Sequence, residues 1–197
     1  MPFVGLTGGI GAGKSTALAA LERLGAAVLS TDRVVHDLYQ SDEMRDAVVA
    51  RWGDEVAPGG SVDRTAVAGR VFASEDDRRW LEALLWPRVG ERVAAWRVEM
   101  ERREPPPRAA VVEIPLLFEA GMEEGFDATV AVVAPEDVRA RRAAGRGHAS
   151  LDARGKRQLT QEEKSQRATY TVSNDASIAD LESRLSAILE NLGLRHR

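Results

Sequence analysis

Residues 5–16 read Gly5-Leu6-Thr7-Gly8-Gly9-Ile10-Gly11-Ala12-Gly13-Lys14-Ser15-Thr16, close to the first residue of a 197-residue chain. They fit the phosphate-loop pattern G-x-x-x-x-G-K-[ST]. The apolar residues 3–6 predict a strand before the loop, and the spacing of residues 16–24 predicts a helix after it. The alternative is a glycine-rich turn with an incidental lysine, but the strand–loop–helix context favours the phosphate loop.

The chemistry of this loop follows from its residue types. Backbone N–H groups hold a polyphosphate, and glycine lets the backbone approach it closely. The N-terminus of the following helix also favours anions. In this pattern Lys14 reaches the β- and γ-phosphates and the Ser15 hydroxyl binds Mg²⁺. The predicted nucleotide site therefore comprises Gly9, Ile10, Gly11, Ala12, Gly13, Lys14, Ser15 and Thr16.

The composition is that of a soluble globular protein, with 44% hydrophobic and 29% charged residues. There is no cysteine, which excludes disulfides, thiolate metal sites and a cysteine nucleophile. A strand beginning at residue 3 leaves no room for a signal peptide, so we expect a cytoplasmic protein without a membrane partner. The net charge of −4 argues against nucleic-acid binding, and we expect a monomer or weak homo-oligomer.

Strands and helices alternate along the chain, which predicts an α/β fold. Near-continuous apolar runs predict a doubly wound, five-stranded parallel sheet, with strands at 3–6, 26–29, 108–114, 128–133 and 170–172. We expect a single domain over 1–197, with a core of 1–41 and 104–197. Residues 42–103 are predicted to form an inserted helical subdomain, which we expect to cover a second substrate, the acceptor. Pro87 is expected to interrupt its last helix.

Asp32 follows the second predicted strand. In an open parallel sheet, ligands bind at the carboxyl ends of the strands, where the phosphate loop also lies. An aspartate at this place is equally suited to capping the next helix, and the two roles do not exclude each other.

A basic segment follows the fourth strand. Residues 139–157 contain seven cations and one acid, and Gly145-Arg146-Gly147 interrupts their helical pattern. We interpret residues 139–158 as a lid that closes over the phosphates, excludes water and neutralises the transferring charge. The alternative is a solvated pair of charged helices.

A nucleotide polyphosphate, a metal ion, acids at strand ends and lid arginines together suit phosphoryl transfer to a small molecule. A nucleotide-sensing GTPase is a different class of protein, and it requires an N-K-x-D guanine signature that this sequence lacks.

Beyond the loop, five further segments stand out: Asp32 with Val34-Val35-His36, Val62-Asp63-Arg64, Leu84-Leu85-Trp86-Pro87, Ile114-Pro115-Leu116-Leu117-Phe118-Glu119 and Asn174. In this order they resemble the dephospho-coenzyme A kinase family, from about residue 3 to residue 177, and the resemblance implies a sheet of the P-loop kinase type. The resemblance implies phosphorylation of the ribose 3′-hydroxyl of dephospho-coenzyme A by ATP and Mg²⁺. Another P-loop small-molecule kinase, acting on a nucleoside monophosphate or shikimate, is the alternative, but it gives no reason for residues 115–119.

The resemblance also implies roles for single residues. Asp32 orients or deprotonates the acceptor hydroxyl, and Arg141, joined by Arg146, acts from the lid on the transferring phosphoryl group. Asn174 lies near the adenine. The side chains that face the acceptor are those of His36, Leu116 and Phe118.

Four positions depart from the family pattern. Ser30 replaces the first acid of D-x-D, and Trp86 replaces a histidine. Glu113 stands in place of an aspartate, and Ala176 in place of a glycine. None of these changes removes Lys14, Ser15, Asp32 or the lid arginines.

Overall fold

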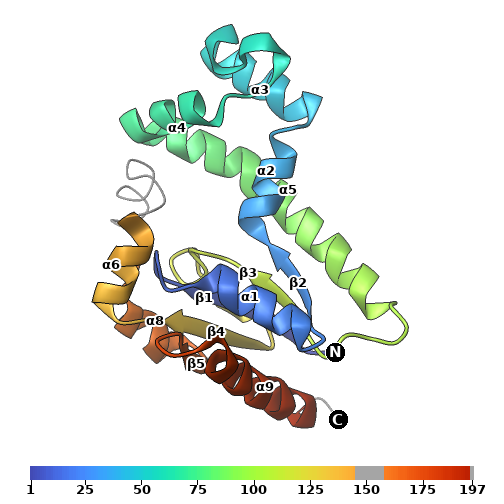
Figure 1. The fold of residues 1–197 in the computed structure, drawn as a ribbon. Coiled ribbons are helices and arrows are strands. Elements are labelled where there is room, and N and C mark those ends of the chain that lie inside the picture. The colour runs from blue at the N-terminus through green and yellow to red at the C-terminus, as the bar shows by residue number, and fades with distance from the viewer. Residues whose placement is uncertain (145–157, 196–197) are drawn as a thin grey trace. The chain divides into compact units, whose positions relative to one another are not determined.

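The computed structural model describes residues 1–144 and 158–195. Its five strands form one parallel sheet in the order β2-β3-β1-β4-β5 (Figure 1). The strands are β1 (Phe3–Gly8), β2 (Ala27–Ser30), β3 (Ala110–Glu113), β4 (Ala128–Val133) and β5 (Tyr170–Ser173). The predicted doubly wound, five-stranded α/β fold is confirmed. All five carboxyl ends meet at one edge because the strands are parallel.

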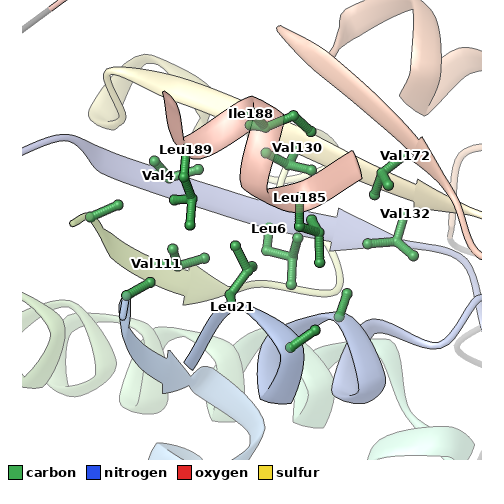
Figure 2. Packing of buried hydrophobic residues seen from close by; sticks show 14 of the residues in the cluster. Val4, Leu6, Leu21, Val111, Val130, Val132, Val172, Leu185, Ile188 and Leu189 are labelled. Carbon is green, nitrogen blue, oxygen red and sulfur yellow. The ribbon is translucent and has the colours of Figure 1, made fainter. Parts of the chain in front are cut away.

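One face of the sheet carries the main hydrophobic core. Val4 and Leu6 of β1, Val111 of β3 and Val130 of β4 project into it, as alternation along a strand requires (Figure 2). Helices α1 (Lys14–Arg23) and α9 (Ile178–Arg195) cover this face. Burying their apolar stripes against the strands fixes the start of α1, and with it the phosphate loop, relative to the sheet.

The opposite face receives the alternate residues of β1. Phe3 stacks on Phe126 with ring centroids 4.7 Å apart, and a Cβ on Gly5 would lie 3.0 Å from Leu117. Thr7 lies beneath helix α8 (Gln161–Arg167). The short 3₁₀ turn η3 (Glu123–Gly125) precedes β4, and helix α6 (Glu136–Ala144) follows β4.

The chain divides into two compact units, Met1–Ser30 with Trp96–Arg197, and Thr31–Ala95. The second unit contains α2 (Thr31–Leu38), α3 (Asp42–Trp52), η1 (Asp54–Val56), η2 (Pro58–Gly60), α4 (Arg64–Ala73) and most of α5 (Glu75–Glu101). It has buried residues of its own, including Met44, Val48 and Val67. The sequence interpretation placed the limits of the helical insertion at 42 and 103.

One local expectation was wrong. Helix α5 passes through Pro87 without ending, and the Arg88 side chain donates a 2.7 Å hydrogen bond to the carbonyl of Leu84 beside the proline. Asp32 lies just past the end of the second strand, because β2 ends at Ser30 and α2 begins at Thr31. Within the described residues, we find no helix with the length and apolarity that crossing a membrane requires.

Candidate active site

The phosphate loop joins the central strand to α1. Two of its glycines, Gly11 with φ 77° and Gly13 with φ 89°, adopt the left-handed conformation that other residues rarely enter. A Cβ on Gly11 would lie 2.5 Å from the carbonyl oxygen of Arg139, and one on Gly13 would lie 2.0 Å from the Asn174 amide nitrogen. Neighbouring groups therefore require glycine at both positions, in addition to the backbone conformation.

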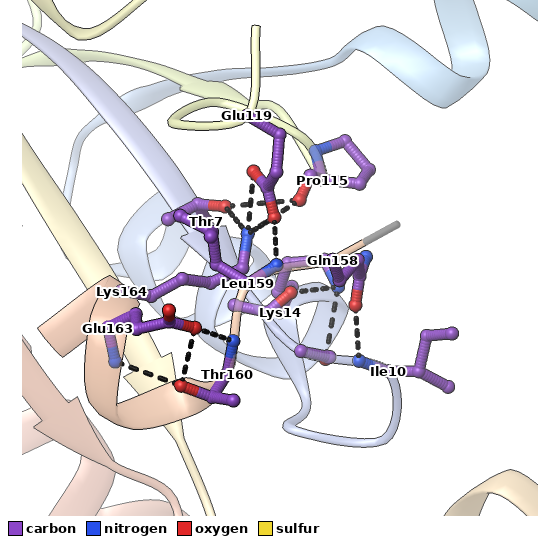
Figure 3. A network of polar contacts seen from close by, with 12 residues as sticks. Thr7, Ile10, Lys14, Pro115, Glu119, Gln158, Leu159, Thr160, Glu163 and Lys164 are labelled. Atoms are coloured by element: carbon purple, nitrogen blue, oxygen red, sulfur yellow. Dashed lines mark hydrogen bonds and ion pairs between the residues drawn. The ribbon is translucent and has the colours of Figure 1, made fainter. Parts of the chain in front are cut away.

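Lys14 is the first residue of α1, as the motif predicts. Its ammonium group donates hydrogen bonds to the carbonyl of Gly8 at 3.0 Å and that of Gly9 at 3.3 Å (Figure 3). The Lys14 ammonium group therefore lies against the first residues of the loop, Gly8 and Gly9. Ser15 is exposed in the same first helical turn, and Thr16 is half-buried beside it.

Helix α6 places two arginines against the loop. The Arg139 guanidinium donates to the carbonyl of Ile10 at 2.9 Å, and Arg142 donates to the carbonyl of Asn174 at 3.3 Å. Arg141, the arginine predicted to act from the lid, is 74% exposed and pairs with Asp137 at 2.9 Å. Its role remains a prediction. Sequence reasoning did not single out Arg139, whose position i−2 from Arg141 places it on another side of the helix.

Asn174 is buried where β5 ends. Its side-chain amide donates to the carbonyl of Ala12 at 2.9 Å, so it supports the phosphate loop directly. The predicted position near adenine stays a prediction.

At the other end of the sheet edge, Ser30 and Glu113 are register partners on β2 and β3. The Ser30 hydroxyl donates a 2.8 Å hydrogen bond to the Glu113 carboxylate, which is only 8% exposed. These are two of the positions that depart from the family pattern. One acid, Glu113, is therefore present at this edge of the sheet, and the neutral hydroxyl of Ser30 donates a hydrogen bond to it.

Magnesium in such sites takes one or two protein oxygen ligands together with substrate phosphates and water. Glu113 is the last residue of β3, and Ser15 lies in the first turn of α1, after the loop that follows the neighbouring strand β1; a carboxylate and a hydroxyl oxygen suit that donor set. Across residues 1–144 and 158–195, no three acidic or histidine side chains gather into a metal cluster. A serine hydroxyl in the first turn of α1, such as that of Ser15, is the kind of single protein ligand that Mg²⁺ takes together with a nucleotide.

The segment after β3 contains two predicted acceptor residues. Leu116 is half-buried, whereas Phe118 is 2% exposed and lies under the Arg167 guanidinium, 4.9 Å from the ring centroid. Phe118 is thus part of the protein interior in this structure. Its contact with the acceptor remains a prediction.

The other two predicted acceptor-side residues belong to the unit Thr31–Ala95. Asp32 is exposed in the first turn of α2, and the His36 ring nitrogen Nδ1 lies 2.9 Å from the Arg64 guanidinium. An acid in the first turn stabilises a helix through its dipole, which is a structural role for Asp32 of the kind that the capping interpretation proposed.

The predicted lid falls mostly outside the described residues, as does Arg146. Gln158, the last residue of the predicted lid, is described, and it reaches the loop: its side-chain oxygen accepts a 3.2 Å hydrogen bond from the N–H of Ile10. Nothing in the sequence around Gln158 signals this contact, because it joins segments that are far apart along the chain.

A phosphate loop between the central strand and first helix of a doubly wound parallel sheet, with arginines against it, defines a P-loop kinase. A family model described as dephospho-CoA kinase matches residues 2–180. The chain therefore belongs to the dephospho-CoA kinase family, and it is an ATP-dependent phosphotransferase.

Individual relatives agree. The dephospho-CoA kinase of Deinococcus radiodurans is 38% identical over 192 residues, which span 96% of this chain and 91% of the relative. The crystal structure of TT1252 from Thermus thermophilus aligns with a TM-score of 0.78 and 36% identity, covering 97% of this chain and 98% of that one. The dephospho-CoA kinase structure from Campylobacter jejuni has a TM-score of 0.70 at 22% identity, covering 98% of each chain, and supports the fold.

Proposed function

We propose that this chain transfers the γ-phosphoryl group of ATP to the ribose 3′-hydroxyl of dephospho-coenzyme A, with Mg²⁺, in the final step of coenzyme A synthesis. One observation carries the proposal: the phosphate loop lies at the carboxyl edge of a sheet in a chain whose residues 2–180 match the dephospho-CoA kinase model. We expect the enzyme to act in the cytoplasm, as a monomer or weak oligomer.

Phosphoryl transfer needs positioning and charge neutralisation more than covalent chemistry. The loop amides and the α1 N-terminus would hold the β- and γ-phosphates of ATP. The Lys14 ammonium would exchange its carbonyl partners, Gly8 and Gly9, for phosphate oxygens. The exchange is favourable because a hydrogen bond between two charged groups is stronger than one to a neutral carbonyl.

The charge that builds up on the transferring group needs cations that are already in place. Mg²⁺ bound to Ser15 would neutralise phosphate oxygens when the nucleotide is present. Arg139 already donates to the loop carbonyl of Ile10. Arg141 and Arg146 would add positive charge from the lid side.

The acceptor hydroxyl must be oriented and must lose its proton. Asp32 would serve as that acid–base group, since its carboxylate is exposed near the start of α2. His36, Leu116 and Phe118 would contact the acceptor, and Asn174 the adenine side of ATP. The nucleoside monophosphate and shikimate alternatives are not favoured, because the family match extends over both the core and the helical insertion.

The test compares dephospho-coenzyme A with its 2′-deoxy and 3′-deoxy analogues, in the presence of ATP and Mg²⁺, by mass spectrometry of the products. The proposal predicts one added phosphate on dephospho-coenzyme A and on the 2′-deoxy analogue, and none on the 3′-deoxy analogue. Phosphorylation of the 3′-deoxy analogue would refute the assigned hydroxyl.

A further inference from the structure

Among residues 1–144 and 158–195, one cation is fully buried, and the reaction above does not use it. Lys164 of α8 has no exposed surface, and its ammonium lies 2.8 Å from one oxygen of Glu119 and 3.1 Å from the other. It also donates to the carbonyl of Pro115 at 3.0 Å and to the Thr7 hydroxyl at 3.3 Å. We call these four residues the Lys164 network (Figure 3).

Stability alone does not explain the network. Removing an ammonium and a carboxylate from water is costly, and an apolar pair of similar size is often as stable or more so. Burial lowers the pKa of Lys164, while the neighbouring Glu119 carboxylate opposes that shift. A charged pair at this place therefore calls for a role other than packing.

The partners of Lys164 lie in segments that serve the reaction. Thr7 immediately precedes Gly8, the first glycine of the phosphate loop. Pro115 and Glu119 are the first and last residues of the Pro-Leu-Leu-Phe-Glu segment after β3. This segment includes Leu116 and Phe118, the two residues predicted to contact the acceptor. One ammonium group thus fixes the strand before the loop to the predicted acceptor segment.

Glu119 extends the network toward the lid. The carboxylate oxygen that pairs with Lys164 at 2.8 Å also accepts a 2.8 Å hydrogen bond from the N–H of Leu159. The preceding residue, Gln158, accepts from the Ile10 N–H inside the phosphate loop. Gln158 is the last residue of the predicted lid, and Leu159 follows it; we call residues 158–159 the lid root. Glu119 and the phosphate loop thus hold the lid root through Leu159 and Gln158.

We propose that Lys164 and Glu119 are positioning residues for phosphoryl transfer: their ion pair sets the phosphate loop, the acceptor segment and the lid root in register. The inference rests on the proposed function. Neither side chain needs to touch a substrate. Displacements of about 1 Å far from the chemistry can lower a rate by about 100-fold, so the pair should act on kcat.

The experiment uses the full chain with two variants, Lys164→Met and the double variant Lys164→Met/Glu119→Gln. The glutamine keeps an acceptor for Leu159 N–H, and no charge stays buried without a partner, so the double variant stays folded even where the single one does not. The control is Arg23→Met/Glu182→Gln, which removes a partly exposed 2.7 Å pair between α1 and α9, away from the loop. Thermal unfolding, kcat, and the Kd for ATP by calorimetry are measured for each.

The folded double variant should lose about 10- to 100-fold in kcat, with its Kd for ATP changed less than about threefold, and the control should keep the wild-type kcat. A folded double variant with kcat within about twofold of the wild type would overturn the proposal and leave the pair a structural one. The wild type is measured first: if it phosphorylates only another acceptor, the proposed function fails, while the kcat ratio on that acceptor still tests the ion pair.

Discussion

The side-chain amide of Asn174 donates a 2.9 Å hydrogen bond to the carbonyl of Ala12, across 162 residues of sequence. A side chain on the next residue, Gly13, would collide with that amide, because a Cβ there would lie 2.0 Å from its nitrogen. The conformation of the phosphate loop therefore depends on Asn174, at the end of β5, as well as on the loop's own glycines.

Gly13→Ala should be more damaging than strain in the backbone alone. A non-glycine residue in the left-handed conformation costs about 1–2 kcal/mol. Gly25 supplies the control, since it has the same φ of 89° but its Cβ would meet the Arg108 side chain at an ordinary 3.5 Å. Urea unfolding should show a larger loss of free energy for Gly13→Ala than for Gly25→Ala, and only the former should weaken ATP binding. Equal losses would mean that Asn174 does not constrain the loop.

Lys14→Ala should remove the ammonium group that neutralises negative charge on the phosphates in the transition state. We expect kcat to fall by about 100- to 1000-fold, the usual effect of deleting one preorganised donor, with the melting temperature nearly unchanged. Arg23→Ala, on the same helix and paired with Glu182, is the control and should keep full activity. Wild-type turnover by Lys14→Ala would remove the phosphate-loop assignment.

Asp32→Asn separates the two interpretations of that residue. If Asp32 is the acid–base group, kcat falls about 100-fold or more while ATP still binds. If it only stabilises the first turn of α2, the rate stays and only the melting temperature drops. Asp37→Asn, an exposed change in the same helix, is the control for altered charge and should leave kcat as it is.

Acid should weaken the capping box that starts α8. The Thr160 hydroxyl and backbone N–H bond the Glu163 carboxylate and hold its pKa below the ordinary value of 4.5. Because the folded-state pKa is depressed, the stabilisation is present above pH 4.5 and is lost as the pH falls through the folded-state pKa. The melting temperature of Glu163→Ala should thus lie below that of the wild type at neutral pH and approach it in acid. Glu162→Ala, in the same helical turn outside the box, should show a smaller pH dependence; an equally large one would contradict the capping explanation.

Much of the fold follows from local sequence. The motif predicted β1, the loop and α1, and apolar continuity predicted β4 with its observed limits of 128 and 133. Asp63 and Thr160 cap α4 and α8, and both are residue types that helix starts favour. Each of these features is determined by residues that are close together in the sequence, within one helical turn or one strand, so the local sequence pattern is enough to predict it.

What the sequence did not predict depends on partners from elsewhere. Periodicity placed arginines on α6 but did not indicate that Arg139, rather than Arg141, contacts the loop. Pro87 was expected to interrupt a helix, yet α5 continues through it, and the Arg88 side chain bonds the nearby Leu84 carbonyl. Lys164 lies in a helix of polar residues, and only the folded chain surrounds it with Glu119 and Pro115.

The most direct test of the central claim is ADP release by the wild-type chain with ATP and Mg²⁺, against dephospho-coenzyme A, AMP, CMP, shikimate and no acceptor, with the product masses recorded. We predict release with dephospho-coenzyme A alone, together with one added phosphate on it. Release with another acceptor and none with dephospho-coenzyme A would contradict the proposed function.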